Sequence, residues 1–181
     1  MVALTDGTGN LAAGVKIDKK RQLILKEVAD PVTGSPVTVT LNNTAFNDPV
    51  SELPQQGSTE LWEIINLTMD AHPMHTHLTQ FQIVNPESFN PLTYPAAWEA
   101  AFGTGPTPLP TGCKAGQFCP GYGPPLSYST LNADGALGGN PAITPYLLAP
   151  STKAAPAPEE AGWKDTAKVM PGQVMRLAVR F

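Results

Sequence analysis

The sequence predicts an all-β sandwich. Three observations lead to this fold class: short apolar runs rich in β-branched residues, turn-forming residues between those runs, and helix-like periodicity in one short stretch only. With 181 residues, of which 41% are hydrophobic, the chain has the length of one domain and enough apolar residues for one core.

The first half of the chain holds the clearest strand patterns. Residues 1–20 are rich in Gly, Asp, Asn and Lys, and we interpret them as a mobile linker or the end of a preceding region, with the domain itself at 21–181. The β-branched runs 23–28 and 37–41 flank a turn-rich loop and predict a strand pair. Two further strands are expected at residues 59–66 and 78–84.

The amino-acid composition changes at the start of the second half. Residues 85–161 contain most of the 20 prolines and many glycines, which is incompatible with a continuous β-ladder, and only residues 94–102 favour a short helix. We interpret 85–161 as an insertion loop that either shapes a pocket or is a solvated excursion. Ordered patterns resume at Trp163, and Pro171-Gly172 predicts a hairpin-like reversal between the last two runs.

All three histidines of the chain lie in the six residues His72-Pro73-Met74-His75-Thr76-His77, at the start of a strand. Strand residues two apart point to the same face and residues three apart to opposite faces. His75 and His77 can therefore share a site, while His72 points elsewhere. A closed metal site needs about four ligands, so this pattern predicts more than one metal centre or ligands from other parts of the structure.

The stretch Ala71–Leu78, followed by Phe81 and Val84, resembles the H-P-x-H-x-H motif in the last cupredoxin domain of multicopper oxidases. The resemblance is to the branch with spore-coat laccase, bilirubin oxidase and phenoxazinone synthase. Further matching stretches lie at 41–43, 48–50, 59–66 and 162–166.

The resemblance implies a cupredoxin-like Greek-key β-sandwich and three copper ligands. His72 would bind the type 1 copper, His75 the type 2 copper and His77 one type 3 copper. The complete enzyme would be a laccase-like multicopper oxidase that removes single electrons from phenolic, aminophenolic, tetrapyrrole or metal-ion donors and reduces dioxygen to water.

The family also has a second motif, His-Cys-His followed by a further His and a Met, shortly after a stretch like Gln173–Phe181. The sequence stops at Phe181, so we expect the last strands to be missing and the chain alone to be inactive. The remaining cupredoxin domains would come from the same polypeptide or from another chain.

Three other residues are candidates for supporting roles. Asp165 would orient a copper ligand through a hydrogen bond, or cap a turn. Cys113 and Cys119 lie in the insertion and predict a small disulfide loop, which favours an extracytoplasmic or secreted protein. Neither fits a type 1 copper thiolate, because such a site needs a cysteine on a rigid strand beside two histidines.

Composition excludes some partners. A net charge of -4 and 14% charged residues leave no basic stripe for nucleic acid, and no apolar run is long enough to cross a membrane. Two alternatives stay open. A cupin-type mononuclear metal oxygenase also uses His-x-His on a strand but needs a carboxylate, such as Glu87, and one more histidine. A non-catalytic metal-binding β-sandwich needs neither.

Overall fold

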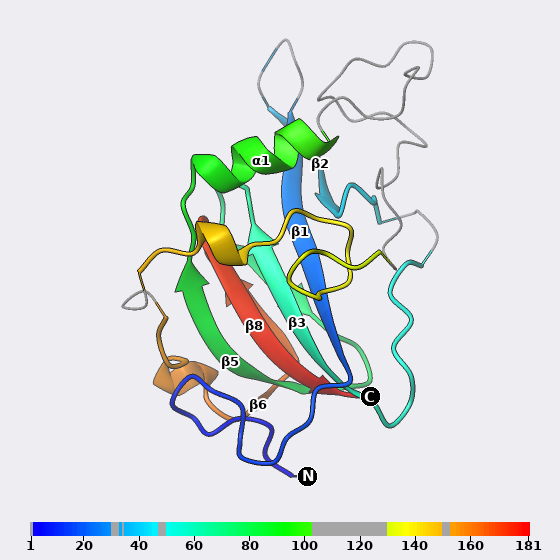
Figure 1. The fold of residues 1–181 in the computed structure, drawn as a ribbon, viewed down its shortest axis with the longest axis vertical. Coiled ribbons are helices and arrows are strands. Elements are labelled where there is room, and N and C mark those ends of the chain that lie inside the picture. The colour runs from blue at the N-terminus through cyan, green and yellow to red at the C-terminus, as the bar shows by residue number, and fades with distance from the viewer. Residues whose placement is uncertain (1, 30–32, 34, 47–49, 103–129, 150–152) are drawn as a thin grey trace.

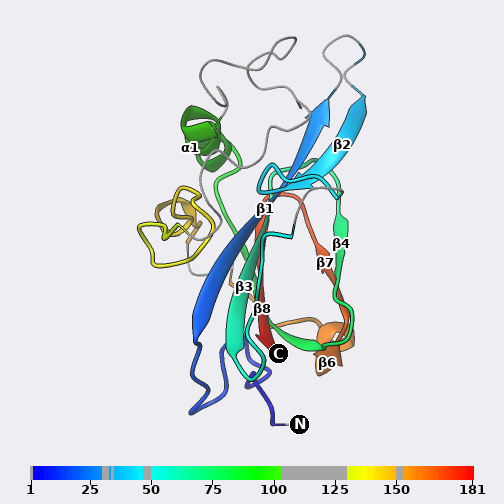
Figure 2. The ribbon, with the colours of Figure 1, turned by 90° about the vertical axis from the view of Figure 1, so that its right-hand side faces the viewer.

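The computed structural model describes residues 2–29, 33, 35–46, 50–102, 130–149 and 153–181, and its core is two facing β-sheets (Figure 1). The larger sheet has the strand order β2-β1-β3-β8-β5-β6, and the smaller sheet pairs β4 with β7. Figure 2 shows the two layers edge-on. The strands are β1 (Lys19–Ala29), β2 (Pro36–Leu41), β3 (Thr59–Asn66), β4 (His72–His75), β5 (Phe81–Ser88), β6 (Trp163–Lys164), β7 (Thr166–Val169) and β8 (Gln173–Arg180). The predicted all-β, cupredoxin-like sandwich is confirmed.

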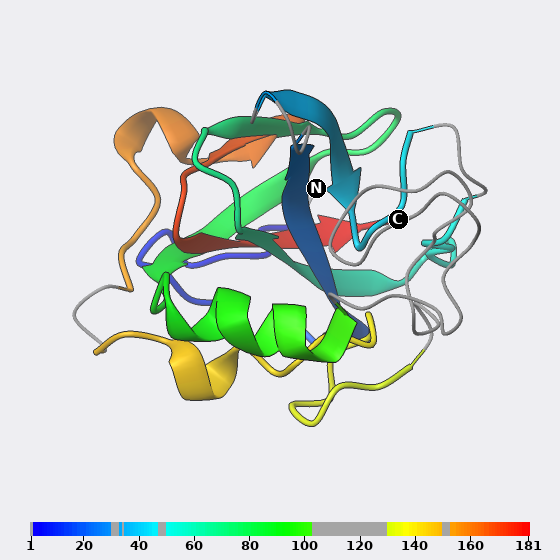
Figure 3. The same cartoon turned by 90° about the horizontal axis from the view of Figure 1, so that it is seen from above.

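Pairing within the large sheet follows the strand patterns of the sequence. The predicted pair β1 and β2 is antiparallel, with Leu25 opposite Leu41. β1 runs parallel to β3, while β3, β8 and β5 are antiparallel neighbours. The central strands are covered on both faces, because the small sheet lies on the inner face and α1 with the described residues 130–149 on the outer face (Figures 2 and 3). This two-sided burial explains why β3 and β8 contain consecutive apolar residues.

Three hydrophobic clusters form the core. The first lies between the sheets and joins residues such as Ile64 and Met175 to Val169 of β7, with Met74 of β4 packed against it. The second lies on the outer face, where Tyr94 and Trp98 of α1 (Thr93–Phe102) pack on the sheet. The helix is the one that the sequence predicted. The described residues also form two short 3-10 helices, η1 (Thr144–Tyr146) and η3 (Pro158–Glu160).

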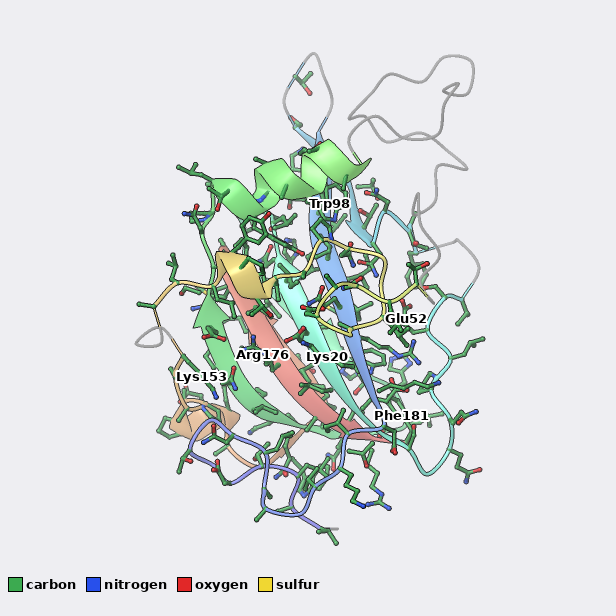
Figure 4. All side chains as sticks on the ribbon, viewed as in Figure 1. Lys20, Glu52, Trp98, Lys153, Arg176 and Phe181 are labelled. Atoms are coloured by element: carbon green, nitrogen blue, oxygen red, sulfur yellow. The ribbon has the colours of Figure 1, made fainter. Side chains whose placement is uncertain are left out.

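A polar cluster sits on the outer face between the apolar ones. Arg176 donates hydrogen bonds from Nε to Glu63 Oε1 at 2.8 Å and from Nη1 to Glu87 Oε2 at 2.6 Å. Lys20 Nζ approaches Glu63 Oε2 at 3.3 Å, and Figure 4 shows Lys20 and Arg176 on the same face of the sheet. Burial lowers the pKa of Arg176, but the carboxylates of Glu63 and Glu87 raise it by more, so the net shift is upward. Arg176 therefore stays charged in this cluster.

The N-terminal segment, which the sequence suggested as a linker, folds back onto the sheet. Leu4 is only 2% exposed and packs with Val84 and Ala178. Its backbone N–H donates to Gln82 Oε1 at 2.5 Å. Leu11 and Val15 pack against the same cluster, and Asn85 Nδ2 donates to the Gly9 carbonyl at 2.8 Å, so apolar and polar contacts both hold this Gly-rich segment against the domain. The boundary between linker and domain stays a prediction.

The described parts of the insertion are attached to the domain rather than detached from it. Gln22 N donates to the Leu137 carbonyl at 2.8 Å, and Leu137 N donates to the Lys20 carbonyl at 2.7 Å, so Leu137 pairs with the first half of β1, which β2 does not reach. A Cβ on Gly138, whose φ is +148°, would lie 2.6 Å from the Gln22 carbonyl oxygen. Glycine is therefore required at this close approach. Cys113 and Cys119 lie outside the described residues, so the predicted disulfide stays a prediction.

The Pro171-Gly172 turn differs from its prediction. It joins β7 to β8, but β7 pairs with β4 in the small sheet and β8 with β3 and β5 in the large one. The predicted hairpin-like reversal is therefore wrong, because the turn carries the chain from one layer of the sandwich to the other. No helix in the described part of the chain is long and apolar enough to cross a membrane.

Candidate metal-ligand site

The three histidines lie on and just after β4, and the strand directs them to two sides. His72 and Met74 are half-buried and alternate with the exposed Pro73 and His75, while His77 is also exposed. The rings of His75 and His77 are 5.0 Å apart between centroids and meet edge to face. As strand periodicity predicted, His75 and His77 share one side and His72 points to the other.

His75 is held by the start of β7. Its Nδ1 lies 2.9 Å from the main-chain oxygen of Asp165 and 3.0 Å from Thr166 Oγ1. A carbonyl oxygen can only accept a hydrogen bond, so Nδ1 carries the proton and donates it. The lone pair of this neutral imidazole is then on Nε2. A fixed N–H on one ring nitrogen is the usual support for a histidine that binds a metal through the other.

His72 is held by different partners and through the opposite nitrogen. Its Nε2 lies 2.7 Å from Thr68 Oγ1 and 3.6 Å from Glu27 Oε1. The Thr68 hydroxyl also lies 2.8 Å from Asn66 Oδ1 and 3.0 Å from the Asp70 carbonyl, both of which only accept. The hydroxyl proton goes to one of these, so Thr68 accepts from the Nε2–H of His72. The lone pair of His72 is then on Nδ1.

The paired histidines open into a hollow of about 630 Å³ lined by residues 75–80 and Asp165. Leu78 forms the turn after His77 with φ of +62°, and its side chain is fully exposed. A left-handed conformation costs a residue such as leucine about 1–2 kcal/mol. The chain accepts this strain where it leaves the histidine pair, and backbone strain of this kind is concentrated at functional sites.

The ligand sets are incomplete within the described residues. No group of three His, Cys, Asp or Glu side chains able to hold a metal occurs in that part of the chain. It supplies one imidazole in one direction and two in the other. The predicted need for ligands from elsewhere stays a prediction. Glu87, which the cupin alternative required, pairs with Arg176 and does not join the histidine pair.

Asp165 contacts His75 through its main-chain oxygen and not through its carboxylate. The main-chain oxygen faces His75, whereas the side-chain Oδ1 accepts from Thr166 Oγ1 at 3.1 Å. A supporting role for Asp165 stays a prediction, now through its backbone. The partners that sequence reasoning missed are Thr68, Glu27 and Thr166. Only Thr166 had a signal, its position beside Asp165, because the other two depend on how the chain folds.

The comparisons with known proteins identify a family. The sequence model of the multicopper oxidases matches residues 19–106. A laccase from Bacillus subtilis is 31% identical over 148 residues, which cover 82% of this chain and 20% of that protein. Residues 19–106 belong to the multicopper oxidase family.

The chain is also similar to other multicopper oxidases. Multicopper oxidase LPR1 from Arabidopsis thaliana is 32% identical over 146 residues, which cover 81% of this chain and 19% of that protein. The crystal structure of a multicopper oxidase from Pediococcus acidilactici has 20% sequence identity and a TM-score of 0.46, and the match covers 94% of this chain and 22% of that one. The chain thus spans about a fifth of the length of these relatives.

Copper is the metal that the family implies, and the histidines of this multicopper oxidase segment fit it in part. Imidazole nitrogen is a good copper ligand. Two of the three rings already have one nitrogen fixed by a hydrogen bond, and the ring atom that remains for the metal differs between His72 and His75. The two rings therefore present different nitrogen atoms, on opposite sides of β4.

Proposed function

We propose that the chain is part of a laccase-like copper oxidase that couples one-electron oxidation of small donors to four-electron reduction of dioxygen to water. The donors would be phenolic, aminophenolic, tetrapyrrole or metal-ion compounds. The observation that carries the proposal is the division of the histidines. His72 faces inward alone, whereas His75 and His77 face outward as a pair with their rings 5.0 Å apart. One strand thereby serves two sites.

The roles of the histidines follow from this division and from the family pattern. His72 would hold the type 1 copper through Nδ1, and His75 would hold the type 2 copper through Nε2. His77 would bind one type 3 copper. Copper supplies the one-electron redox chemistry, and the protein sets distances, access and potential. Thr68 and Glu27 fix the ring of His72, and the carbonyl of Asp165 fixes the ring of His75.

The other ligands and partners belong to the same proposal. Each centre requires ligands beyond those of the described residues, and we assign them to further cupredoxin domains of the same polypeptide or of another chain. The exposed hollow beside His75 and His77 is where such a domain would complete the cluster. The relatives from Bacillus subtilis and Arabidopsis thaliana are a laccase and a multicopper oxidase, which supports a small reducing substrate. An extracytoplasmic location is part of this proposal.

The test is copper content and oxygen uptake of the full-length protein and its histidine variants. His72→Ala is expected to remove one class of copper, seen as loss of the blue thiolate absorption, while the other copper stays bound. His75→Ala and His77→Ala are expected to lower the copper content and abolish dioxygen reduction, with the blue absorption retained. Lys168→Ala, an exposed change on the neighbouring strand β7, is the matched control.

Two results on copper binding would contradict the proposal. One is a protein that holds no copper after loading under conditions where it is folded. The other is a set of three variants that all lose the same copper signal, because that would mean one site and not two. Oxygen uptake with a phenolic donor, unchanged in all three variants, would also exclude the assigned roles.

A further inference from the structure

Asn66, the last residue of β3, is completely buried, and both ends of its carboxamide are hydrogen-bonded. Its Nδ2 donates to the carbonyls of Asp70 at 2.8 Å and Val169 at 3.0 Å. Its Oδ1 accepts from Thr68 N at 2.8 Å. Carbonyl oxygens only accept and a backbone N–H only donates, so the carboxamide fits these partners in one orientation. Its oxygen is therefore held toward Thr68.

The Asn66 oxygen in turn directs the hydroxyl of Thr68. That hydroxyl has one proton and two lone pairs. Asp70 N donates to it at 3.2 Å and takes up one lone pair. Asn66 Oδ1 lies 2.8 Å from Thr68 Oγ1, closer than the Asp70 carbonyl at 3.0 Å, which already accepts from Asn66 Nδ2. The hydroxyl proton therefore goes to Asn66, and the second lone pair is left for His72 Nε2 at 2.7 Å.

Glu27 also approaches this nitrogen of His72, but from farther away. Its Oε1 lies 3.6 Å from Nε2, which is beyond hydrogen-bond distance. The Thr68 hydroxyl makes the shorter contact with the same atom. The orientation of that hydroxyl, and with it the side chain of Asn66, therefore decides where the ring proton of His72 lies.

We propose that Asn66 is a positioning residue for His72, which it reaches through Thr68, and that it keeps the ring proton on Nε2 so that Nδ1 is left to bind the metal. The proposal rests on the proposed function, in which His72 is a copper ligand through Nδ1. Without the Asn66 oxygen, the Thr68 hydroxyl is free to turn its proton toward Nε2. The ring proton would then sit on Nδ1, where no lone pair would remain for a metal.

The test measures the ratio of the two neutral tautomers of His72 by ¹⁵N NMR of the copper-free full-length protein, at about pH 9, above the range in which an ordinary imidazole titrates. Asn66→Ala is expected to lower the ratio of the Nε2–H form to the Nδ1–H form about fivefold, the equivalent of one net hydrogen bond. Asn85→Ala is the matched control. Asn85 is also buried and donates to the Gly9 carbonyl at 2.8 Å, so its loss should leave the ratio unchanged.

Variants of Thr68 separate an effect through the hydroxyl from a general loosening of the structure. Thr68→Ser keeps the hydroxyl and should keep the ratio, whereas Thr68→Val removes the hydroxyl and should lower the ratio as Asn66→Ala does. In the Thr68→Val background, Asn66→Ala should change the ratio by less than about twofold, because the two residues act in series. Glu27→Ala should leave the ratio unchanged.

Three results would overturn the proposal. The first is an unchanged ratio in folded Asn66→Ala. The second is an equal effect of Asn66→Ala with and without the Thr68 hydroxyl. The third is an equal ratio in Thr68→Val and Thr68→Ser, and this comparison decides the matter if Asn66→Ala does not fold. Since none of these measurements needs copper, a protein that fails to bind copper would count against the proposed function and not against the role of Asn66.

Discussion

Tyr94 holds α1 against the outer face of the sheet, and replacing it by phenylalanine separates two effects of its hydroxyl. The ring is completely buried and meets Phe89 and Tyr146 edge to face. The hydroxyl donates to the Pro141 carbonyl at 3.0 Å. Burial, and then the carboxylates of Asp134 and Glu63, raise the pKa of Tyr94 far above its ordinary value of 10.0.

The sign of the pH effect follows from that direction. Below pH 10 the phenol is protonated in both the folded and the unfolded protein. Above pH 10 the unfolded chain loses the proton while the folded protein keeps it, so the unfolded state is favoured. Each pH unit in this range removes about 1.4 kcal/mol of stability. Tyr94→Phe has no proton to lose and escapes this loss.

The two effects oppose each other at high pH. At pH 8 the variant should be less stable by about 1 kcal/mol, the net value of a hydrogen bond to a buried carbonyl. At pH 11 the ionisation term of about 1.4 kcal/mol offsets that loss, so the two proteins should have nearly equal stability. The measurement is the free energy of unfolding in denaturant at pH 8, 9, 10 and 11, for both proteins.

The difference between the two proteins is the quantity that matters, because lysines and other tyrosines titrate in both. A difference that stays constant from pH 8 to pH 11 would refute the reasoning, since it would mean that Tyr94 ionises as easily in the folded protein as in the unfolded one. A difference that grows with pH would reverse the sign and show that the folded state stabilises the phenolate.

Three further predictions concern other parts of the chain. Arg176→Met should cost about 3 kcal/mol in unfolding free energy, because it leaves the buried Glu87 without its cation and Glu63 with Lys20 alone, whereas the exposed Arg180→Met should change it by less than about 0.5 kcal/mol. Thr68→Val should weaken copper binding at His72 about 10- to 100-fold in a copper titration, and Thr166→Val should have a smaller effect at His75, because the Asp165 carbonyl remains. Gly138→Ala should lower the thermal midpoint more than Gly135→Ala, because a Cβ meets the Gln22 carbonyl at the first position and open space at the second.

The histidine arrangement could be predicted because it depends on the local geometry of one strand. Alternation along residues 72–77 already separates His72 from the other two, and the structure keeps that separation. The partners of the rings could not be predicted in the same way. Glu27 comes from a strand 45 positions earlier in the sequence, and its approach to His72 depends on how the two sheets face each other.

Composition was a poor guide to two Gly-rich segments, because a few buried side chains decide where these segments lie. Residues 2–18 and 130–149 are rich in glycine and turn residues, yet Leu4 and Ile143 are buried and attach these segments to the outer face of the sheet. The burial of the charged residues of β3 and β8 could not be predicted either. Glu63 and Arg176 have the pattern of solvent-facing residues, and only the structure shows that they pair with each other. A pattern of single residues carries no information on such pairs.

The site depends most on the register between β4 and β7. His72 lies opposite Val169 and His75 opposite Thr166. A slip by one residue would turn every side chain of β4 to the other face, which would move His75 inward and His72 outward. Hydrogen bonds at both ends of β4 oppose such a slip. At one end, the buried Asn66 amide donates to the carbonyls of Asp70 at 2.8 Å and Val169 at 3.0 Å.

At the other end of β4, the Asp165 carbonyl accepts from Thr76 N at 2.9 Å and from His75 Nδ1 at 2.9 Å. The same hydrogen bond that sets the proton on His75 therefore also sets the register of its strand. The Asp165 carbonyl thus fixes both the orientation of the His75 ring and the pairing of β4 with β7. A change that loosens the Asn66 contacts, which hold the same pairing at the other end, should therefore also disturb His75, although Asn66 and His75 share no hydrogen bond.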